Sequence, residues 1–231
     1  MPVTAKEKII VALDAPNTSA ALRLVDSLGG SVGWVKIGLQ LFTAEGPAIV
    51  REVKARGYRV FLDLKFHDIP NTAREAVRSA VNLGVDMTTI HLSGGRTMVR
   101  EAVRAAEGSP LLVLGVTVLT SFNEEELRGI GVNRTPAEQV TELVNLGVDV
   151  GLRGVVCSPH EIAPLRERFG SALTIVTPGV RPPGSSADDQ QRVMTPVEAV
   201  RAGASHLVIG RPITGAASPG EAAAAIVASL E

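Results

Sequence analysis

The sequence predicts an α/β protein folded as a single closed (β/α)8 TIM barrel, and three observations lead to this prediction. Short runs rich in β-branched residues alternate with longer stretches of helical period, and eight such runs occur along the chain. No linker interrupts the alternation. The length of 231 residues is close to the roughly 250 residues typical of such barrels. We therefore expect one barrel domain over residues 1–231.

An open, doubly wound sheet is the alternative arrangement of alternating strands and helices. That fold usually places a glycine-rich fingerprint directly after its first strand, and the residues that follow Leu13 do not form one. The closed barrel is therefore the favoured prediction.

Strands are expected where apolar runs end at polar residues or at glycine. Their expected bounds are residues 9–13, 34–38, 59–62 leading into the polar stretch 63–72 that includes the helix start at Pro70, 87–91, 111–118, 154–157, 173–176 and 206–209.

Helix boundaries are predicted from capping residues. Asn17 or Thr18 can cap the helix after the first strand, because a short polar side chain accepts a backbone N–H at a helix start. The helix that begins at Pro70 should end at Gly84, since glycine readily adopts the left-handed conformation that closes helices.

The segment 123–131 is expected to form a short extra helix before the longer one at 136–146. The segment 182–189 is rich in Pro, Gly, Ser and Asp, and it is interpreted as a loop after the seventh strand.

Composition excludes several classes of function. A formal net charge of −1, a pI of about 6.4 and 3% aromatic residues leave no basic or stacking surface for nucleic acid. The longest apolar run, over residues 111–119, is too short to span a membrane. The first residues lack the apolar core of a signal peptide, and the single cysteine, Cys157, suits a reducing compartment. We therefore expect a cytoplasmic protein.

Polar residues collect at the expected carboxyl ends of the strands, where the active sites of such barrels lie. They are Asp14, Lys36, Asp63, Lys65, Asp68, His91, Thr120, Arg181 and Arg211. A fold selected only for stability would place apolar or small residues at many of these positions.

Asp63 and Lys65 are expected to share one face of the third strand, because side chains alternate between the two faces. Burying two charges costs several kcal/mol per ion, so the pair needs an explanation. One is an internal salt bridge, with Asp68 capping the next helix. The other is chemical. Together with Lys36 and Asp68, the pair forms an array of alternating sign, which favours charged lysines. A charged lysine can donate a proton where a fixed carboxylate repels a departing one, as decarboxylation requires.

An anion site is expected after strands seven and eight, where such barrels commonly bind phosphate. Gly210 permits close approach of the backbone, Arg211 offers a bidentate donor, and Pro212 suits the first position of a helix. Arg181 on the preceding loop would add a second cation. The alternatives are a surface salt bridge for Arg211 and a solvated side chain for Arg181.

The remaining polar candidates carry weaker signals. The four histidines have no metal-ligand spacing, so no metal site is expected. His67 is interpreted as structural, whereas His91 either lines the pocket or is a satisfied core histidine. Cys157 is expected to be a small core residue.

With these residues assembled, the chain resembles the orotidine 5′-phosphate decarboxylase family, in its bacterial single-domain form, over essentially its full length. The resemblance depends on Asp63-x-Lys65-x-x-Asp68-Ile69-Pro70-Asn71-Thr72. It is supported by Leu13-Asp14, Lys36-Ile37-Gly38, Thr177-Pro178-Gly179-Val180-Arg181 and Ile209-Gly210-Arg211-Pro212-Ile213.

The resemblance implies the conversion of orotidine 5′-monophosphate to uridine 5′-monophosphate in pyrimidine synthesis, with no metal or organic cofactor. Lys65 would protonate C6, with Asp63 beside the departing carboxylate. Lys36 and Asp14 would contact the ribose. Asp68 and Thr72 would reach the partner's site in a homodimer.

The resemblance also implies substrate contacts at the base and at the phosphate. Thr120 would approach the pyrimidine, and the phosphate would be held by Arg181, Gly210, Arg211 and Gln190, the choice between Gln190 and Gln191 remaining open.

Two other readings compete with this one. A related Mg²⁺-dependent sugar-phosphate decarboxylase or aldolase would need an acidic residue at the end of the second strand, where Lys36 would repel the metal. A non-catalytic sensor of a phosphorylated ligand would have no use for a proton donor beside carboxylates.

Overall fold

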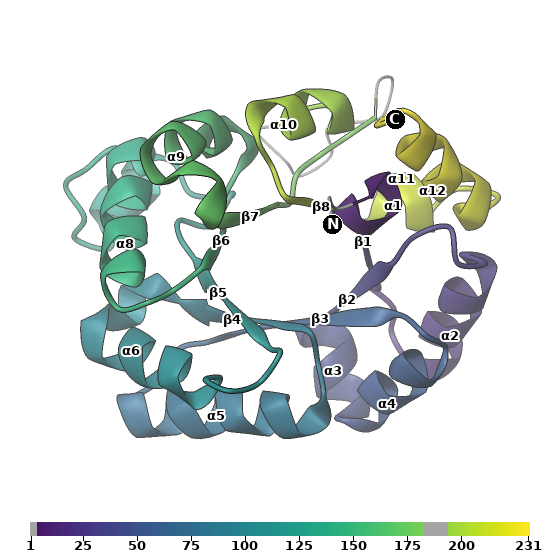
Figure 1. Ribbon diagram of the computed structural model, residues 1–231, viewed down its shortest axis with the longest axis horizontal. Coiled ribbons are helices and arrows are strands. Elements are labelled where there is room, and N and C mark those ends of the chain that lie inside the picture. Colours follow the sequence, from purple (N-terminus) through teal and green to yellow (C-terminus); the bar gives the residue numbers. More distant parts are fainter. Residues whose placement is uncertain (1–3, 183–193) are drawn as a thin grey trace.

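The computed structural model describes residues 4–182 and 194–231, and in these residues the chain folds as a closed barrel. Eight parallel strands follow one another around the barrel in chain order, and the last pairs with the first. Helices surround the ring of strands (Figure 1). The predicted (β/α)8 fold is confirmed.

Each strand lies close to its predicted position. The strands are β1 Ile9–Ala12, β2 Trp34–Gly38, β3 Arg59–Phe66, β4 Met87–His91, β5 Leu112–Val116, β6 Gly154–Val156, β7 Thr174–Thr177 and β8 His206–Ile209. β5 is shorter at both ends than expected, and β3 continues past the apolar run 59–62 through Asp63 and Lys65 to Phe66.

The helices connect these strands on the outside of the barrel. They are α1 Ala5–Lys8, α2 Thr18–Ser27, α3 Leu39–Glu45, α4 Ala48–Ala55, α5 Pro70–Leu83, α6 Gly95–Ala105, α7 Glu124–Gly129, α8 Pro136–Asp149, α9 Ile162–Phe169, α10 Pro196–Ala202, α11 Arg211–Thr214 and α12 Pro219–Ala228. Short 3-10 turns, η1 Leu92–Gly94, η2 Pro159–Glu161 and η3 Gly170–Ala172, adjoin α6 and α9.

The predicted caps are present where they can be checked. The Asn17 side chain, rather than that of Thr18, caps α2 by accepting the Ala20 N–H at 2.9 Å. Gly84 closes α5 with φ of 74°. The expected extra helix is α7, capped by Asn123. After β2 the chain forms two helices, α3 and α4, because it turns at Gly46 with φ of 63°.

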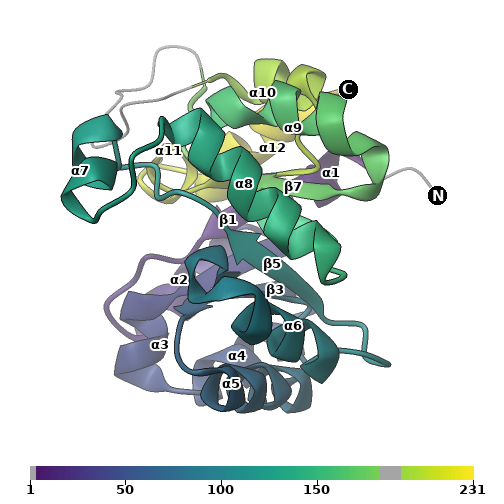
Figure 2. The same ribbon diagram turned by 90° about the vertical axis from the view of Figure 1, so that its left-hand side faces the viewer.

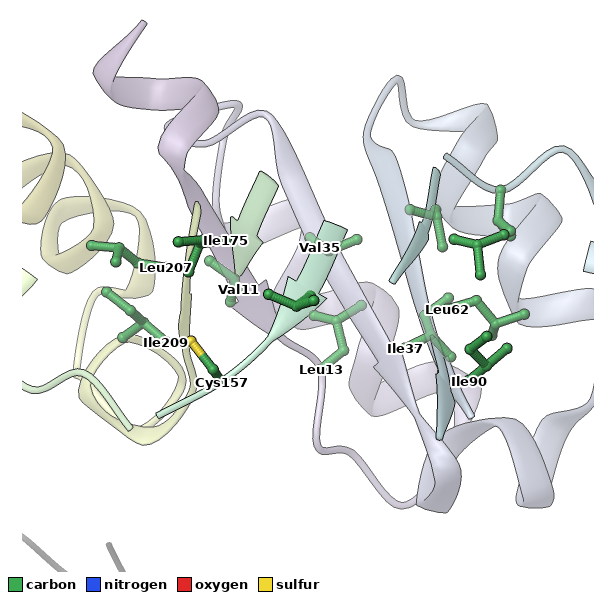
Figure 3. Close-up of a cluster of buried hydrophobic side chains, with 14 of the residues drawn as sticks. Val11, Leu13, Val35, Ile37, Leu62, Ile90, Cys157, Ile175, Leu207 and Ile209 are labelled. Atoms are coloured by element: carbon green, nitrogen blue, oxygen red, sulfur yellow. The ribbon is translucent and has the colours of Figure 1, made fainter. Parts of the chain in front are cut away.

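Two apolar layers hold the barrel together. Ile10, Trp34, Phe61, Met87 and other inward residues fill its interior. A larger core lies between the strands and the helices. Figure 3 shows part of it, with side chains from β1, β2, β3, β4, β7 and β8. Cys157, predicted to be a small core residue, is buried in this layer.

Helix α1 lies at the amino-terminal end of the barrel, away from α7, which follows β5 (Figure 2). The Glu7 backbone carbonyl contacts His206 Nδ1 at 2.9 Å. The Glu7 carboxylate accepts the Trp34 indole N–H at 3.1 Å and pairs with Arg59 at 3.2 Å. These contacts tie the start of the chain to β2, β3 and β8.

Candidate active site

A cavity of about 240 Å³ opens at the carboxyl ends of the strands. Lys36, Asp63, Lys65 and Thr120 supply its polar lining, and side chains such as Phe61, Val116, Val156 and Val208 supply an apolar floor. A larger cavity of about 370 Å³ lies outside the barrel, between α3, α4 and α5, and its lining is mainly apolar. Only the first of these two brings an acid and a base together.

Four charged side chains form a continuous array at this cavity. Lys65 Nζ lies 2.9 Å from both carboxylate oxygens of Asp63. Lys36 Nζ lies 3.9 Å from Asp63 and 3.5 Å from Asp14. The Lys36 and Asp63 side chains are only 12% and 14% exposed, whereas Asp14 is 63% exposed. The array therefore begins in solvent at Asp14 and ends at Lys65 inside the barrel mouth.

The backbone of β3 is distorted where it carries this pair. Leu62 is in register with Thr88 and Phe66 with Ile90, so four residues of β3 span two of β4. Within this bulge Lys65 has φ of 52°, the only positive φ of a non-glycine residue in the described chain. A lysine in this region costs about 1–2 kcal/mol. Asp63 and Lys65 contact each other as their predicted shared face implies, on a bulged segment of strand that alternation alone does not predict.

Space for the Lys36 ammonium comes from Gly38. A Cβ atom at position 38 would lie 2.9 Å from Lys36 Nζ and 3.9 Å from Asp14 Oδ1. Gly210, at the end of β8, also lies close to Asp14, since a Cβ there would lie 3.6 Å from Asp14 Oδ2. Asp14 is thus the member of the array that lies nearest to Gly210, one of the residues of the expected anion site.

Asp68 and Thr72 are not part of the array within this chain. Both are exposed, and Asp68 Oδ1 accepts the Ile69 backbone N–H at 2.7 Å. Asp68 therefore does not cap α5 in the usual way, because the N-cap position is Ile69, which makes no side-chain capping bond. Ile69 is itself 67% exposed at the carboxyl-terminal end of the barrel, here called the rim.

The expected anion-binding residues lie on the loops after β7 and β8. Gly210 is the N-cap of α11, a helix of four residues, and the exposed Arg211 is its first residue. Arg181 Nη1 donates to the Val180 carbonyl at 3.1 Å, while its buried Nε has no hydrogen-bond partner in the described structure. Gln190 and Gln191 lie outside the described residues.

Two histidines lie beside the array. The rings of His67 and His91 are 5.3 Å apart. Burial lowers the pKa of His91 below its ordinary value, and the neighbouring charges of His67 and Lys65 lower this pKa further. His91 is therefore mainly neutral near pH 7.

Thr89 and Gly38 were not among the predicted site residues. The Thr89 hydroxyl donates to Asp63 Oδ1 at 2.9 Å and accepts the Lys65 backbone N–H at 2.8 Å. The available signal for Thr89 was a threonine on the face of the strand that it shares with Met87 and His91. For Gly38 the signal was a glycine two residues after Lys36, at the expected end of the second strand.

Among the described residues, no group of three or more His, Cys, Asp or Glu side chains is arranged to hold a metal ion. None of the described helices has the length and apolar character needed to cross a membrane.

Comparisons with known proteins identify the family of the chain. The model of the orotidine 5′-phosphate decarboxylase / HUMPS family matches residues 7–226. A protein from Moorella thermoacetica named orotidine 5′-phosphate decarboxylase is 54% identical, over 98% of this chain and 93% of that protein. One of the same name from Opitutus terrae is 53% identical, over 96% of this chain and 98% of that protein.

Solved structures show the same relationship. The crystal structure of orotidine 5′-phosphate decarboxylase from Lactobacillus acidophilus superposes with a TM-score of 0.87 at 36% identity, covering 97% of this chain and 99% of that one. An uncharacterized conserved protein from Geobacillus kaustophilus gives a TM-score of 0.85 at 35% identity, covering 96% of this chain and all of that one. The chain therefore belongs to the orotidine 5′-phosphate decarboxylase / HUMPS family.

Proposed function

We propose that this protein is a carboxy-lyase that decarboxylates orotidine 5′-monophosphate to uridine 5′-monophosphate in pyrimidine biosynthesis. The observation that carries the proposal is the contact array from Asp14 through Lys36 and Asp63 to Lys65, placed at the mouth of a barrel cavity. Family membership and relatives at about half identity support the same activity.

The proposed reaction uses Asp63 and Lys65 as its chemical groups. With the pyrimidine in the cavity, the substrate carboxylate would face the Asp63 carboxylate, and the repulsion is relieved as carbon dioxide leaves. The C6–carboxylate bond breaks and its electron pair stays on C6. Lys65 Nζ–H then delivers a proton to C6, and the neutral lysine regains a proton from solvent.

Lys36 is assigned two tasks in this scheme. Its ammonium lies between Asp14 and Asp63, so it balances the charge of both carboxylates while keeping Asp63 fixed. With Asp14 it would also bind the ribose hydroxyls. A cation at this position disfavours the Mg²⁺-dependent alternative, because it would repel a divalent ion. The proposed reaction needs neither a metal nor an organic cofactor.

Substrate binding is assigned to residues around the cavity. Thr120 lines the cavity and would contact the pyrimidine. Arg181, Gly210 and Arg211 would hold the phosphate, and Gln190, which is outside the described residues, is proposed to join them. Phosphate binding far from C6 would supply energy that stabilises the transition state.

We propose a homodimer in which Asp68 and Thr72 complete the site of the partner subunit. Both side chains are exposed on the rim and make no contact with the array of their own chain, and Ile69 beside them is a largely exposed apolar residue. A cytoplasmic location is proposed from the single, buried cysteine.

The activity is tested by following the orotate absorbance band of orotidine 5′-monophosphate with and without EDTA. Two results together would support the proposal: the wild-type protein removes the band at equal rates with and without EDTA, and Lys65→Ala removes it at almost no rate. No loss with the wild-type protein would reject it, and turnover of a sugar phosphate only with added Mg²⁺ would establish the alternative.

The shared site is tested by mixing two inactive variants, Lys65→Ala and Asp68→Ala. Random reassociation of subunits makes half of the dimers mixed, and each mixed dimer holds one intact site of two. About a quarter of wild-type activity should therefore return. Absence of any recovery after verified subunit exchange would place Asp68 in its own subunit's site or outside the site.

A further inference from the structure

Thr89 lies directly beneath the acid–base pair. It is completely buried in β4, and its hydroxyl lies between two groups of the β3 bulge. One is the Lys65 backbone N–H, which donates to Thr89 Oγ1 at 2.8 Å, and the other is Asp63 Oδ1, which accepts from Oγ1 at 2.9 Å. One side chain therefore contacts both members of the pair.

The direction of these bonds follows from the donors available. A backbone N–H can only donate, so the lone pairs of the Thr89 oxygen accept from Lys65. The hydroxyl proton is then free to point at the Asp63 carboxylate, which can only accept when ionised. Asp63 Oδ1 also accepts from Lys65 Nζ at 2.9 Å, so the hydroxyl orients the oxygen that the ammonium contacts.

The β3 bulge explains why a side chain is needed here. Where register between β3 and β4 is lost, the Lys65 N–H has no ladder carbonyl, and a buried N–H without a partner is unfavourable. Thr89 supplies the missing acceptor from the neighbouring strand. It therefore stabilises the left-handed conformation of Lys65, with φ of 52°.

We propose that Thr89 is a positioning residue for the decarboxylation, fixing the Asp63 carboxylate and the Lys65 backbone in the arrangement that proton transfer requires. This inference depends on the proposed function. Thr89 itself is not placed against the reacting atoms. Its contribution is to geometry, and a displacement of about 1 Å at a reacting group can cost about a hundredfold in rate.

The neighbouring Thr88 provides a matched control. It is also completely buried in β4, and its hydroxyl also bonds to β3, donating to the Leu62 carbonyl at 3.0 Å. Strand alternation places it on the opposite face, away from the cavity. Replacing either threonine by valine removes one buried hydroxyl with little change of shape, but only Thr89→Val removes a contact with the pair.

The test compares Thr89→Val, Thr89→Ser and Thr88→Val. We expect Thr89→Val to lower kcat by about 10- to 100-fold with KM changed less than about threefold. Serine keeps the hydroxyl, so Thr89→Ser should recover most of the rate. Thr88→Val should keep kcat within about twofold of wild type, even if its thermal unfolding midpoint falls as far as that of Thr89→Val.

Three outcomes would overturn the inference: near-normal kcat in Thr89→Val, an equal loss of kcat in Thr88→Val, or no recovery with serine. A crystal structure of Thr89→Val gives a readout independent of activity, since Lys65 or Asp63 should shift. Unchanged geometry of both would also overturn it. An inactive wild-type protein would instead reject the proposed function, and the crystal structure would still decide whether Thr89 holds the pair.

Discussion

Replacing Gly38 by alanine should lower activity without unfolding the protein. The new Cβ atom would lie 2.9 Å from Lys36 Nζ, which is too close for contact, so the ammonium must move. The backbone at position 38 has φ of −96°, which alanine adopts without strain. Because the obstructed atom is the end of a flexible side chain, the fold should accommodate the change.

The size of the effect follows from the charges. With an effective dielectric constant of about 20, the attraction between Lys36 Nζ and Asp63 at 3.9 Å is about 4 kcal/mol. A withdrawal of about 1 Å weakens it by about 1 kcal/mol. If this attraction fixes the array in the transition state, kcat/KM should fall about fivefold. The contact with Asp14 adds less, because water screens that carboxylate.

The assay measures kcat/KM from the loss of orotate absorbance, together with the thermal unfolding midpoint. Gly129→Ala is the control, since Gly129 is exposed in α7 and a Cβ there meets no atom within 4 Å. We expect the control to match wild type in kcat/KM. Unchanged kcat/KM in Gly38→Ala, with Lys36 visibly displaced in its crystal structure, would refute the proposed role of Lys36.

Three further predictions concern activity and stability. Arg211→Ala should lower kcat/KM on the whole nucleotide much more than on the nucleoside lacking phosphate; equal losses on both would contradict phosphate binding. Burial lowers the pKa of His206, so below pH 6.5 the unfolded chain binds a proton that the folded chain resists. The free energy of unfolding should therefore decrease as the pH is lowered. Between pH 7.5 and 5, the thermal unfolding midpoint should fall less steeply in His206→Gln than in wild type or in the exposed-site control His160→Gln. Gly115→Ala would place a Cβ 2.6 Å from Leu92 Cδ2, and urea unfolding should show a loss of about 1–3 kcal/mol, with no loss meaning that this core can relax.

The order of strands and helices could be predicted because each element carries a local signal. β-branched runs mark the strands, and Asn17 and Gly84 mark helix ends, so the signal and its cause lie within a few residues. Helix α1 has only four residues and no periodicity, so it was missed. The turn at Gly46 was also missed, since glycine within an apolar helical stretch does not by itself reveal whether the helix continues.

The site was predicted less completely, because its geometry depends on contacts between strands. Strand alternation correctly placed Asp63 and Lys65 on one face. It could not predict the β3 bulge, since the missing ladder bond is replaced by Thr89, which is 24 residues from Lys65 in sequence. Contacts across subunits, as proposed for Asp68, leave no periodic signal in one chain at all.

The pairing of β1 with β8 has a consequence for the synthesis of this protein. Ile9 is in register with Leu207, so the barrel cannot close until nearly the whole chain has left the ribosome. At roughly 5–20 residues per second, the β1 edge waits for about 10–40 seconds without its second neighbour.

During that interval the nascent chain exposes two open strand edges, one on β1 and one on the last strand made. Unpaired edges of apolar strands are sites of aggregation. Ribosome-bound chains that stop before β8 should therefore depend on chaperones, and the released full-length chain should not. The barrel that protects its edges when complete is, for this reason, most vulnerable just before its last strand arrives.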